Sequence, residues 1–135
     1  MKANELMLGD FIYHKENDYY GEVTGVFDTG EIYIDGVIAY IADCAPIPLT
    51  PEILEKNAFK PFEVNYEPKN LIGKWWDKNG YVCVKQYCLS NVSYRKGHTV
   101  FTVSTGIHSR IGNIIFIHQF QHALKLCGIE KTIEL

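Results

Sequence analysis

Two histidines stand at a spacing that metal chemistry uses. His118 and His122 are four residues apart, which places them on one face of a helix. Zinc proteases of the His-Glu-x-x-His type bind their metal through such a pair and use the glutamate as general base. Gln119 occupies the glutamate position here, so that base is missing. A metal-dependent hydrolase that uses this pair is therefore a hypothesis that ranks third, after the two binding functions given below. We expect instead a structural His118 near the helix start, a partly exposed His122 and no cofactor.

Nucleophiles and acid–base pairs lack the surroundings that catalysis needs. Ser109 lies between His108 and Arg110 in an expected loop over 105–112, but the Gly-x-Ser-x-Gly pattern of a nucleophile elbow is missing. Neither Gly-x-x-x-x-Gly-Lys-Ser/Thr nor Gly-x-Gly-x-x-Gly occurs, so no phosphate loop is expected. We therefore lean toward a protein that is not an enzyme. The acidic pairs that we interpret as solvated are Glu16 with Asp18 and Glu52 with Glu55.

The cysteines and the apolar runs bear on the compartment. Glu5 and Asp10 interrupt the apolar N-terminus before a signal peptide can form, and the longest apolar runs are too short to span a bilayer. We therefore expect a cytoplasmic protein with no membrane partner. Cys83 and Cys88 have an odd spacing that puts them on opposite faces of an unbroken strand, which argues against a zinc site. The four scattered cysteines, which also argue against a disulfide framework, are Cys44, Cys83, Cys88 and Cys127.

Residues 74–98 interleave cations with aromatic side chains. Single-stranded nucleic acid is held by this combination, because rings stack on bases while cations follow the phosphates. On a strand, Lys85 and Tyr87 share a face, whereas Trp75 and Trp76 point to opposite faces, so one belongs to the core if the other is exposed. The candidate binding surface comprises Lys74, Trp75, Trp76, Lys78, Lys85, Tyr87, Arg95 and Lys96.

Charge is distributed unevenly along the 135 residues, although the net charge is only −3. Residues 1–68 hold thirteen acidic and four basic residues, whereas residues 69–110 hold seven basic residues and Asp77 alone as an acid. The two halves therefore attract each other, within the protein or in a head-to-tail homo-oligomer. We expect first a non-enzymatic binding or accessory protein with a protein partner or a second copy. Single-stranded nucleic-acid binding through 74–98 is the alternative.

The elements that must position these residues are mostly strands. Short runs over 10–14, 21–27, 31–35 and 37–41 are separated by turn signals, including Asp35-Gly36, and this pattern predicts a small barrel or curled sheet. Gly9-Asp10-Phe11-Ile12 followed by Gly21-Glu22-Val23 resembles the opening of Src-homology-3-like barrels.

A short helix over 51–57 follows. Thr50 is a good N-cap, Pro51 suits the first helical position, and Asn57 is expected to end the helix in the left-handed conformation. We place a subdomain boundary after Pro68, where the charge changes sign.

The second half predicts an antiparallel sheet and a helix. Strands are expected over 62–66, 81–87, 92–95, 99–104 and 113–116, with turns at Asn79-Gly80 and Lys96-Gly97. A helix over 117–127 ends at Gly128, and residues 132–135 are expected to pair as an edge strand. The fold class is α+β: an acidic barrel-like subdomain over 1–68, then a basic sheet with its helix over 69–135, or one continuous domain.

Three blocks resemble a known family. They are Ala3-Asn4-Glu5-Leu6-Met7-Leu8-Gly9, the segment from Ile47 to Phe59, and Ile117-His118-Gln119-Phe120-Gln121-His122-Ala123-Leu124. Together they are similar to short uncharacterised proteins of gut Bacteroidetes, carried by prophages and mobile elements, with a capped mid-chain helix and a His-Gln-Leu-Gln-like C-terminal helix. Phe120 stands where that pattern has leucine. The resemblance implies an origin and a fold unit, and it implies no reaction.

Overall fold

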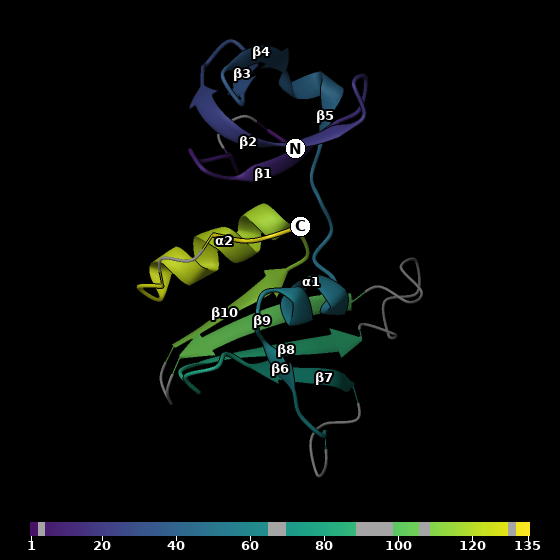
Figure 1. Cartoon of the computed structure of the whole chain (residues 1–135), viewed down its shortest axis with the longest axis vertical. Coiled ribbons are helices and arrows are strands. Elements are labelled where there is room, and N and C mark those ends of the chain that lie inside the picture. Colours follow the sequence, from purple (N-terminus) through teal and green to yellow (C-terminus); the bar gives the residue numbers. More distant parts are fainter. Residues whose placement is uncertain (3–4, 65–69, 89–98, 106–108, 130–131) are drawn as a thin grey trace. The chain divides into compact units, whose positions relative to one another are not determined.

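The computed structural model describes residues 1–2, 5–64, 70–88, 99–105, 109–129 and 132–135 (Figure 1). The chain forms two compact units. Unit 1 comprises Met1–Pro48 with Phe116–Gln121, and unit 2 comprises Leu49–Ile115 with His122–Leu135. The boundary that the charge pattern placed after Pro68 thus lies inside unit 2, because the helix and edge strand that follow Pro48 pack with the second sheet.

Unit 1 is a curled antiparallel sheet with the strand order β4-β3-β2-β1-β5. Strand β1 pairs with β2 on one side and with the short β5 on the other, and the sheet is curled (Figure 1). All four strands expected in this region are confirmed. The elements are β1 (Phe11–His14), β2 (Tyr19–Val26), β3 (Glu31–Ile34), β4 (Val37–Tyr40), the 3-10 helix η2 (Ile41–Asp43) and β5 (Cys44–Ala45).

Alternation along the strands builds the core of unit 1. Ile32 and Ile34 of β3 are fully buried, whereas Tyr33 between them is exposed. The β3–β4 hairpin closes with Asp35 and Gly36, whose φ angles of 50° and 80° match the two left-handed positions of a type I′ turn. The buried apolar cluster contains Leu6, Ile12, Val23, Ile32, Ile34, Ala39 and Cys44.

Unit 1 also includes the first residues of the C-terminal helix. The Gln121 side chain accepts a hydrogen bond from the Phe11 N–H at 3.0 Å and donates one to the Gly9 carbonyl at 2.9 Å. One amide thereby satisfies a donor and an acceptor at the start of β1, which explains why Gln121 is buried.

Unit 2 is a five-stranded antiparallel sheet with the order β10-β9-β8-β7-β6. The expected meander and C-terminal helix are therefore confirmed. Figure 1 shows helix α1 against one side of this sheet. The elements are α1 (Pro51–Lys56), β6 (Lys60–Pro61), β7 (Leu71–Trp76), β8 (Val82–Cys88), β9 (Thr99–Thr105), β10 (Ser109–Ile114) and α2 (Ile117–Leu126), the last of which is shared between the units.

Several boundaries differ from expectation. Strand β6 lies at Lys60–Pro61, because these residues pair with the end of β7. In the strand expected over 62–66, residues 62–64 are not strand, and residues 65–66 lie outside the described residues. Strand β10 begins at Ser109, so the expected loop over 105–112 is partly strand, held by pairing with β9. The strand expected over 92–95 and the turn at Lys96-Gly97 lie outside the described residues.

Of the two predictions for the ends of α1, one is confirmed and the other is wrong. Thr50 Oγ1 accepts a hydrogen bond from the Ile53 N–H at 3.3 Å, which confirms the N-cap. The prediction that Asn57 would adopt a left-handed conformation is wrong: its φ is −98°, and Ala58 takes that conformation with φ 67°. The Asn57 side chain binds the C-terminal segment of the chain.

Asn57 holds the C-terminal segment through its amide. Its Nδ2 donates to the Glu134 carbonyl at 2.8 Å and its Oδ1 accepts from the Glu134 N–H at 2.8 Å. The edge strand expected over 132–135 is therefore absent, since this side chain replaces the partner strand and Ile133 is buried. At the end of α2, Gly128 has φ 76° and the Ile129 N–H bonds to the Leu124 carbonyl at 2.8 Å, which confirms the predicted cap.

Among the described residues, no helix combines the length and the apolar composition required to cross a membrane.

Candidate functional site

The two faces of the unit 2 sheet differ in character. Trp75 pairs with Val84, and Val84 pairs with Val103, so these three side chains point to the same face. All three are buried, which makes this the inner face. On the alternate residues, Lys74 pairs with Lys85 on the opposite face, which we call the outer face.

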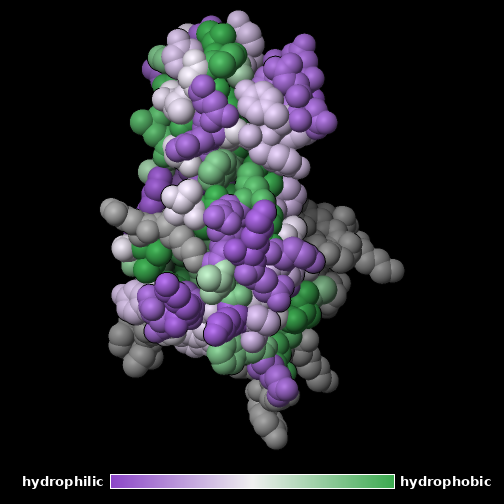
Figure 2. All heavy atoms as spheres, viewed as in Figure 1, coloured by the Kyte–Doolittle hydropathy of each residue, from purple (hydrophilic) through white to green (hydrophobic). Residues whose placement is uncertain are grey.

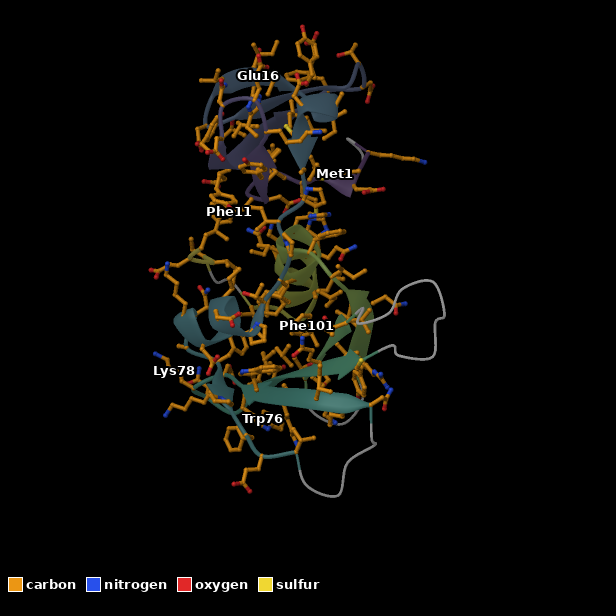
Figure 3. The ribbon with its side chains drawn as sticks, turned by 90° about the vertical axis from the view of Figure 1, so that its right-hand side faces the viewer. Met1, Phe11, Glu16, Trp76, Lys78 and Phe101 are labelled. Carbon is orange, nitrogen blue, oxygen red and sulfur yellow. The ribbon has the colours of Figure 1, made fainter. Side chains whose placement is uncertain are left out.

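The two adjacent tryptophans therefore have different surroundings. Trp75 is 5% exposed, and its ring lies 6.2 Å from that of Phe101 in the interior. It cannot contribute to a binding surface, so of the two only Trp76, which is half-buried, remains a candidate. Figure 3 shows Phe101 within unit 2 and Trp76 with Lys78 at its surface.

One row of paired residues runs across the outer face from edge to edge, and Cys83 at its centre is buried. Trp76 of β7 lies between Lys60 of β6 and Cys83 of β8, and the row continues to β10. The members, in order from β6 to β10, are Lys60, Trp76, Cys83, Ser104 and Arg110. Cations thus occupy both ends of the row, and the indole lies beside one of them.

A second row carries two like charges. Lys74 and Lys85 are direct cross-strand neighbours, and Lys85 also pairs with Thr102 of β9. This row adds two neighbouring cationic side chains to the outer face.

Tyr87 and Arg110 complete the outer face. The Arg110 guanidinium carbon lies 5.5 Å from the centre of the Tyr87 ring, within the range of a cation–π interaction. Tyr87 pairs with Val100 and Arg110 pairs with Ser104, so their contact passes over Thr102, which is buried. The contact holds an aromatic ring and an exposed cation together, and the guanidinium keeps its N–H groups for other acceptors.

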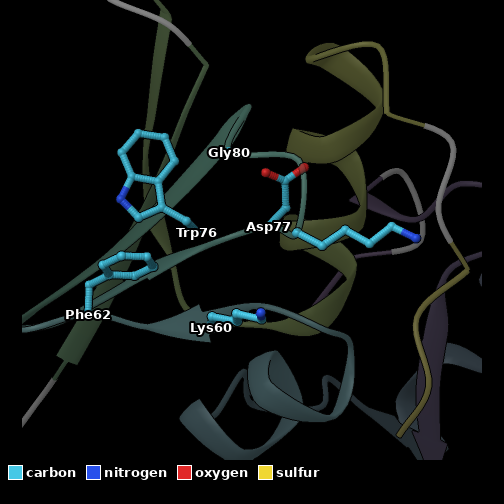
Figure 4. Close-up of a pocket in the computed structure, with 6 residues that line it drawn as sticks. Lys60, Phe62, Trp76, Asp77 and Gly80 are labelled. Atoms are coloured by element: carbon cyan, nitrogen blue, oxygen red, sulfur yellow. The ribbon is translucent and has the colours of Figure 1, made fainter.

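A pocket of about 460 Å³ opens at the β6 edge of this sheet (Figure 4). Trp76 and Phe62 project into it from neighbouring strands. The Phe62 N–H donates to the Lys74 carbonyl at 2.8 Å, which extends the β6–β7 pairing by one residue and places Phe62 on the outer face. The lining residues are Lys60, Phe62, Trp76, Asp77, Lys78 and Gly80.

The carboxylate in this pocket serves the turn. Asp77 Oδ1 accepts hydrogen bonds from the backbone N–H groups of Tyr81 at 2.7 Å and Val82 at 3.0 Å. Gly80 follows with φ 68°, a conformation that suits glycine. The predicted turn at Asn79-Gly80 is confirmed, and Asp77 has a structural role within it.

Part of this surface agrees with the candidate residues predicted from the sequence. Lys74, Trp76, Lys85 and Tyr87 lie on the outer face, and Lys78 is exposed in the adjoining turn. Arg95 and Lys96 lie outside the described residues. The residues that were missed are Lys60, Phe62 and Arg110. The alternation of Lys60 with Phe62 was the available signal, but nothing local indicates that β6 pairs with β7.

The histidines and cysteines are placed separately. His118 is buried and its ring stacks on Phe116 with the centroids 5.9 Å apart, whereas His122 is half-buried. Across the described ranges, no group of three or more His, Cys, Asp or Glu side chains is arranged to hold a metal ion. Cys83 and Cys88 lie on opposite faces of β8, as their spacing predicted.

Comparison of the chain with known protein families, curated proteins and solved structures finds no match in any of the three. Function is therefore inferred from the outer face of unit 2 and from the exposed side chains of unit 1.

Proposed function

We propose that the protein is a non-enzymatic binding module that holds single-stranded nucleic acid on the outer face of the β6–β10 sheet. The observation that carries the proposal is that Lys85 and Arg110 share the outer face with the rings of Trp76 and Tyr87. Cations on a sheet surface attract the phosphates of a strand that lies along it.

The aromatic side chains favour a single strand over a duplex. Trp76 and Tyr87 share the outer face with the cations and are partly exposed. A base contacts such a ring through its flat side, and in a duplex that side is covered by the neighbouring base pairs. Stacking of this kind contributes about 1–3 kcal/mol per base and depends little on sequence.

Tryptophan fluorescence tests the proposal, because the two indoles report on different environments. Trp75 is buried and Trp76 is half-buried, so oligothymidylate should quench Trp76 and leave Trp75 unchanged. Affinity should fall with salt, with a slope of log K against log salt of about −2 to −3 for three or four phosphate contacts. Trp76→Phe should lose the quenching. An unchanged spectrum together with no binding in a gel-shift titration would contradict the proposal.

A charge-matched variant controls for non-specific attraction. Lys15→Ala in unit 1 removes the same charge as Lys85→Ala, and Lys15 is exposed and distant in sequence from the outer face. Only Lys85→Ala should weaken oligonucleotide binding by more than twofold. Equal losses in both variants would mean that net charge, and not this surface, governs binding.

A protein partner or second copy is the second candidate, and unit 1 supplies the observation that favours it. Tyr33 and Ile38 are cross-strand neighbours and both are exposed, and Phe27 packs edge-on against Tyr33 with the centroids 5.1 Å apart. Figure 2 shows hydrophobic side chains at the surface around the β3–β4 hairpin. Light scattering on wild type and Ile38→Lys tests self-association: a concentration-dependent dimer that the variant loses supports it, and a monomer throughout contradicts it.

We also propose three further properties. Unit 1 is a Src-homology-3-like barrel, the protein is cytoplasmic, and it is an accessory protein of a Bacteroidetes mobile element. The double pairing of β1 and the position of η2 between β4 and β5 support the first. Phage or transposition genes beside the coding sequence would support the third, and a conserved housekeeping neighbourhood would count against it.

A further inference from the structure

We propose that the pocket at the β6 edge accepts one nucleobase turned out of the bound strand, inserted between the rings of Trp76 and Phe62. This inference rests on the proposed function, because it assigns a part of the ligand to a part of the same surface. Lys60 and Lys78 then lie where they attract the phosphates on either side of that base.

The strand register sets the spacing of the two rings. Trp76 pairs with Lys60, and the Phe62 N–H bonds to the Lys74 carbonyl. Phe62 is therefore the diagonal neighbour of Trp76 on the outer face, and such positions lie about 7–8 Å apart. A flat ring in contact on both sides needs about 7–8 Å, since carbon atoms in contact are about 3.5–4 Å apart. Two rings that extend side by side from positions at this spacing leave room for one planar base.

Both rings are available. Phe62 is 54% exposed although it is a large apolar side chain, and Trp76 is half-buried. Figure 4 shows the rings of Trp76 and Phe62 near each other among the residues that line the pocket, with Lys60 on the same segment as Phe62. The volume of about 460 Å³ lies within the usual range for small-ligand sites, roughly 300–1,000 Å³.

The charges around the pocket select an anionic ligand. Lys60 and Lys78 are both exposed, whereas the Asp77 carboxylate accepts two backbone hydrogen bonds within the turn. A neutral aromatic compound would use the rings alone, and a nucleotide uses the rings and the cations together. A duplex must unpair and extrude a base before it can fill the pocket, which gives single strands a further advantage.

A strand with a single base isolates the pocket. The probe is a ten-nucleotide DNA strand that carries a single 2-aminopurine. All of its remaining positions are abasic sugars, so only that base can be inserted. Stacking between two rings should quench the fluorescence of 2-aminopurine. Phe62→Ala should abolish this quenching and lower affinity for oligothymidylate roughly tenfold. Phe62 is mostly exposed, so truncating it removes little of the core, and circular dichroism checks that the fold is kept.

Tyr20→Ala is the matched control, because Tyr20 is 60% exposed in unit 1, outside this surface. It should leave quenching and affinity unchanged. Lys78→Ala should weaken binding of the strand and reduce its salt dependence while the bound base is still quenched.

The outcomes separate this inference from the function on which it rests. The base-binding pocket is refuted, and the sheet surface stands, if the probe and oligothymidylate bind in a salt-dependent way but 2-aminopurine is not quenched. The same conclusion follows if Phe62→Ala behaves as Tyr20→Ala does. If free 2-aminopurine binds as tightly as the strand, the ligand is a neutral aromatic compound. If neither strand binds, the proposed function fails as well.

Discussion

Trp75 and Gly73 are packed so closely that the glycine cannot carry a side chain. A β-carbon built on Gly73 would lie 2.6 Å from Trp75 Cζ3, well inside contact distance. The indole of Trp75 therefore lies across the backbone of its own strand, on the inner face, while Trp76 projects from the outer face. This packing fixes which of the two adjacent tryptophans is available to a ligand.

Gly73→Ala should destabilise unit 2 by about 1–3 kcal/mol, because the Trp75 ring must leave its position in the core. Urea denaturation measures the loss. Gly112→Ala in β10 is the matched control: its β-carbon would meet only Thr102 Cγ2, at 3.9 Å, so stability should change by about 0.5 kcal/mol or less. Similar losses in both variants would show that glycine flexibility, and not contact with Trp75, sets the cost.

Asn57 and Ala58 should respond in opposite directions. Asn57→Ala removes the side-chain hydrogen bonds to Glu134 and to the Ile53 carbonyl at a buried site, which should cost about 1–3 kcal/mol. Ala58→Gly should stabilise the protein by about 1 kcal/mol, because alanine is strained at φ 67° and glycine is not. Thermal unfolding measures both. A stabilised Asn57→Ala would mean that the C-terminal segment is not held by this amide.

The salt dependence of oligonucleotide binding should distinguish the contribution of the cationic side chains from that of the aromatic rings. Lys85→Ala and Arg110→Ala should each lower the slope of log K against log salt by about 0.7, the value for one phosphate on a single strand. Tyr87→Leu should weaken binding with little change in slope, because a ring releases no counterion. A slope that is unchanged in both cation variants would mean that the phosphates do not follow the outer face.

The thiol of Cys44 should be a poor nucleophile at mildly alkaline pH. Burial, and then the nearby Asp43 carboxylate, raise the pKa of Cys44, while Lys15 opposes them. Alkylation of Cys44 followed by peptide mass spectrometry should show a rate that Asp43→Asn increases and Lys15→Ala decreases. A Lys15→Ala variant that reacts faster than wild type would contradict this assignment.

The same raised pKa links Cys44 to stability. The folded protein holds the thiol proton more tightly than the unfolded chain, whose cysteine pKa is about 8.5. The stabilising contribution is therefore fully present below about pH 8.5 and is lost as the pH rises through the higher folded value. Cys44→Ala should flatten this alkaline decline in urea midpoint.

Local chemistry could be read from the sequence by itself. The turns at Asp35-Gly36 and Asn79-Gly80, the Thr50 N-cap and the Gly128 cap depend on residues a few positions apart, and each forms as predicted. The alternation of apolar residues likewise determined the strands of unit 1 and the presence of a sheet in unit 2.

Only the tertiary structure decided which residues meet. The alternation of a strand implies that Trp75 and Trp76 point to opposite faces, but it does not determine which of the two is buried. The packing of Trp75 near Phe101 in the core decides this. Asn57 ends helix α1 as predicted, but no local signal showed that its side chain binds Glu134, 77 residues away. Phe62 joined the candidate pocket only through the pairing of β6 with β7. Contacts between distant residues depend on how whole elements pack, and no short stretch of sequence carries that information.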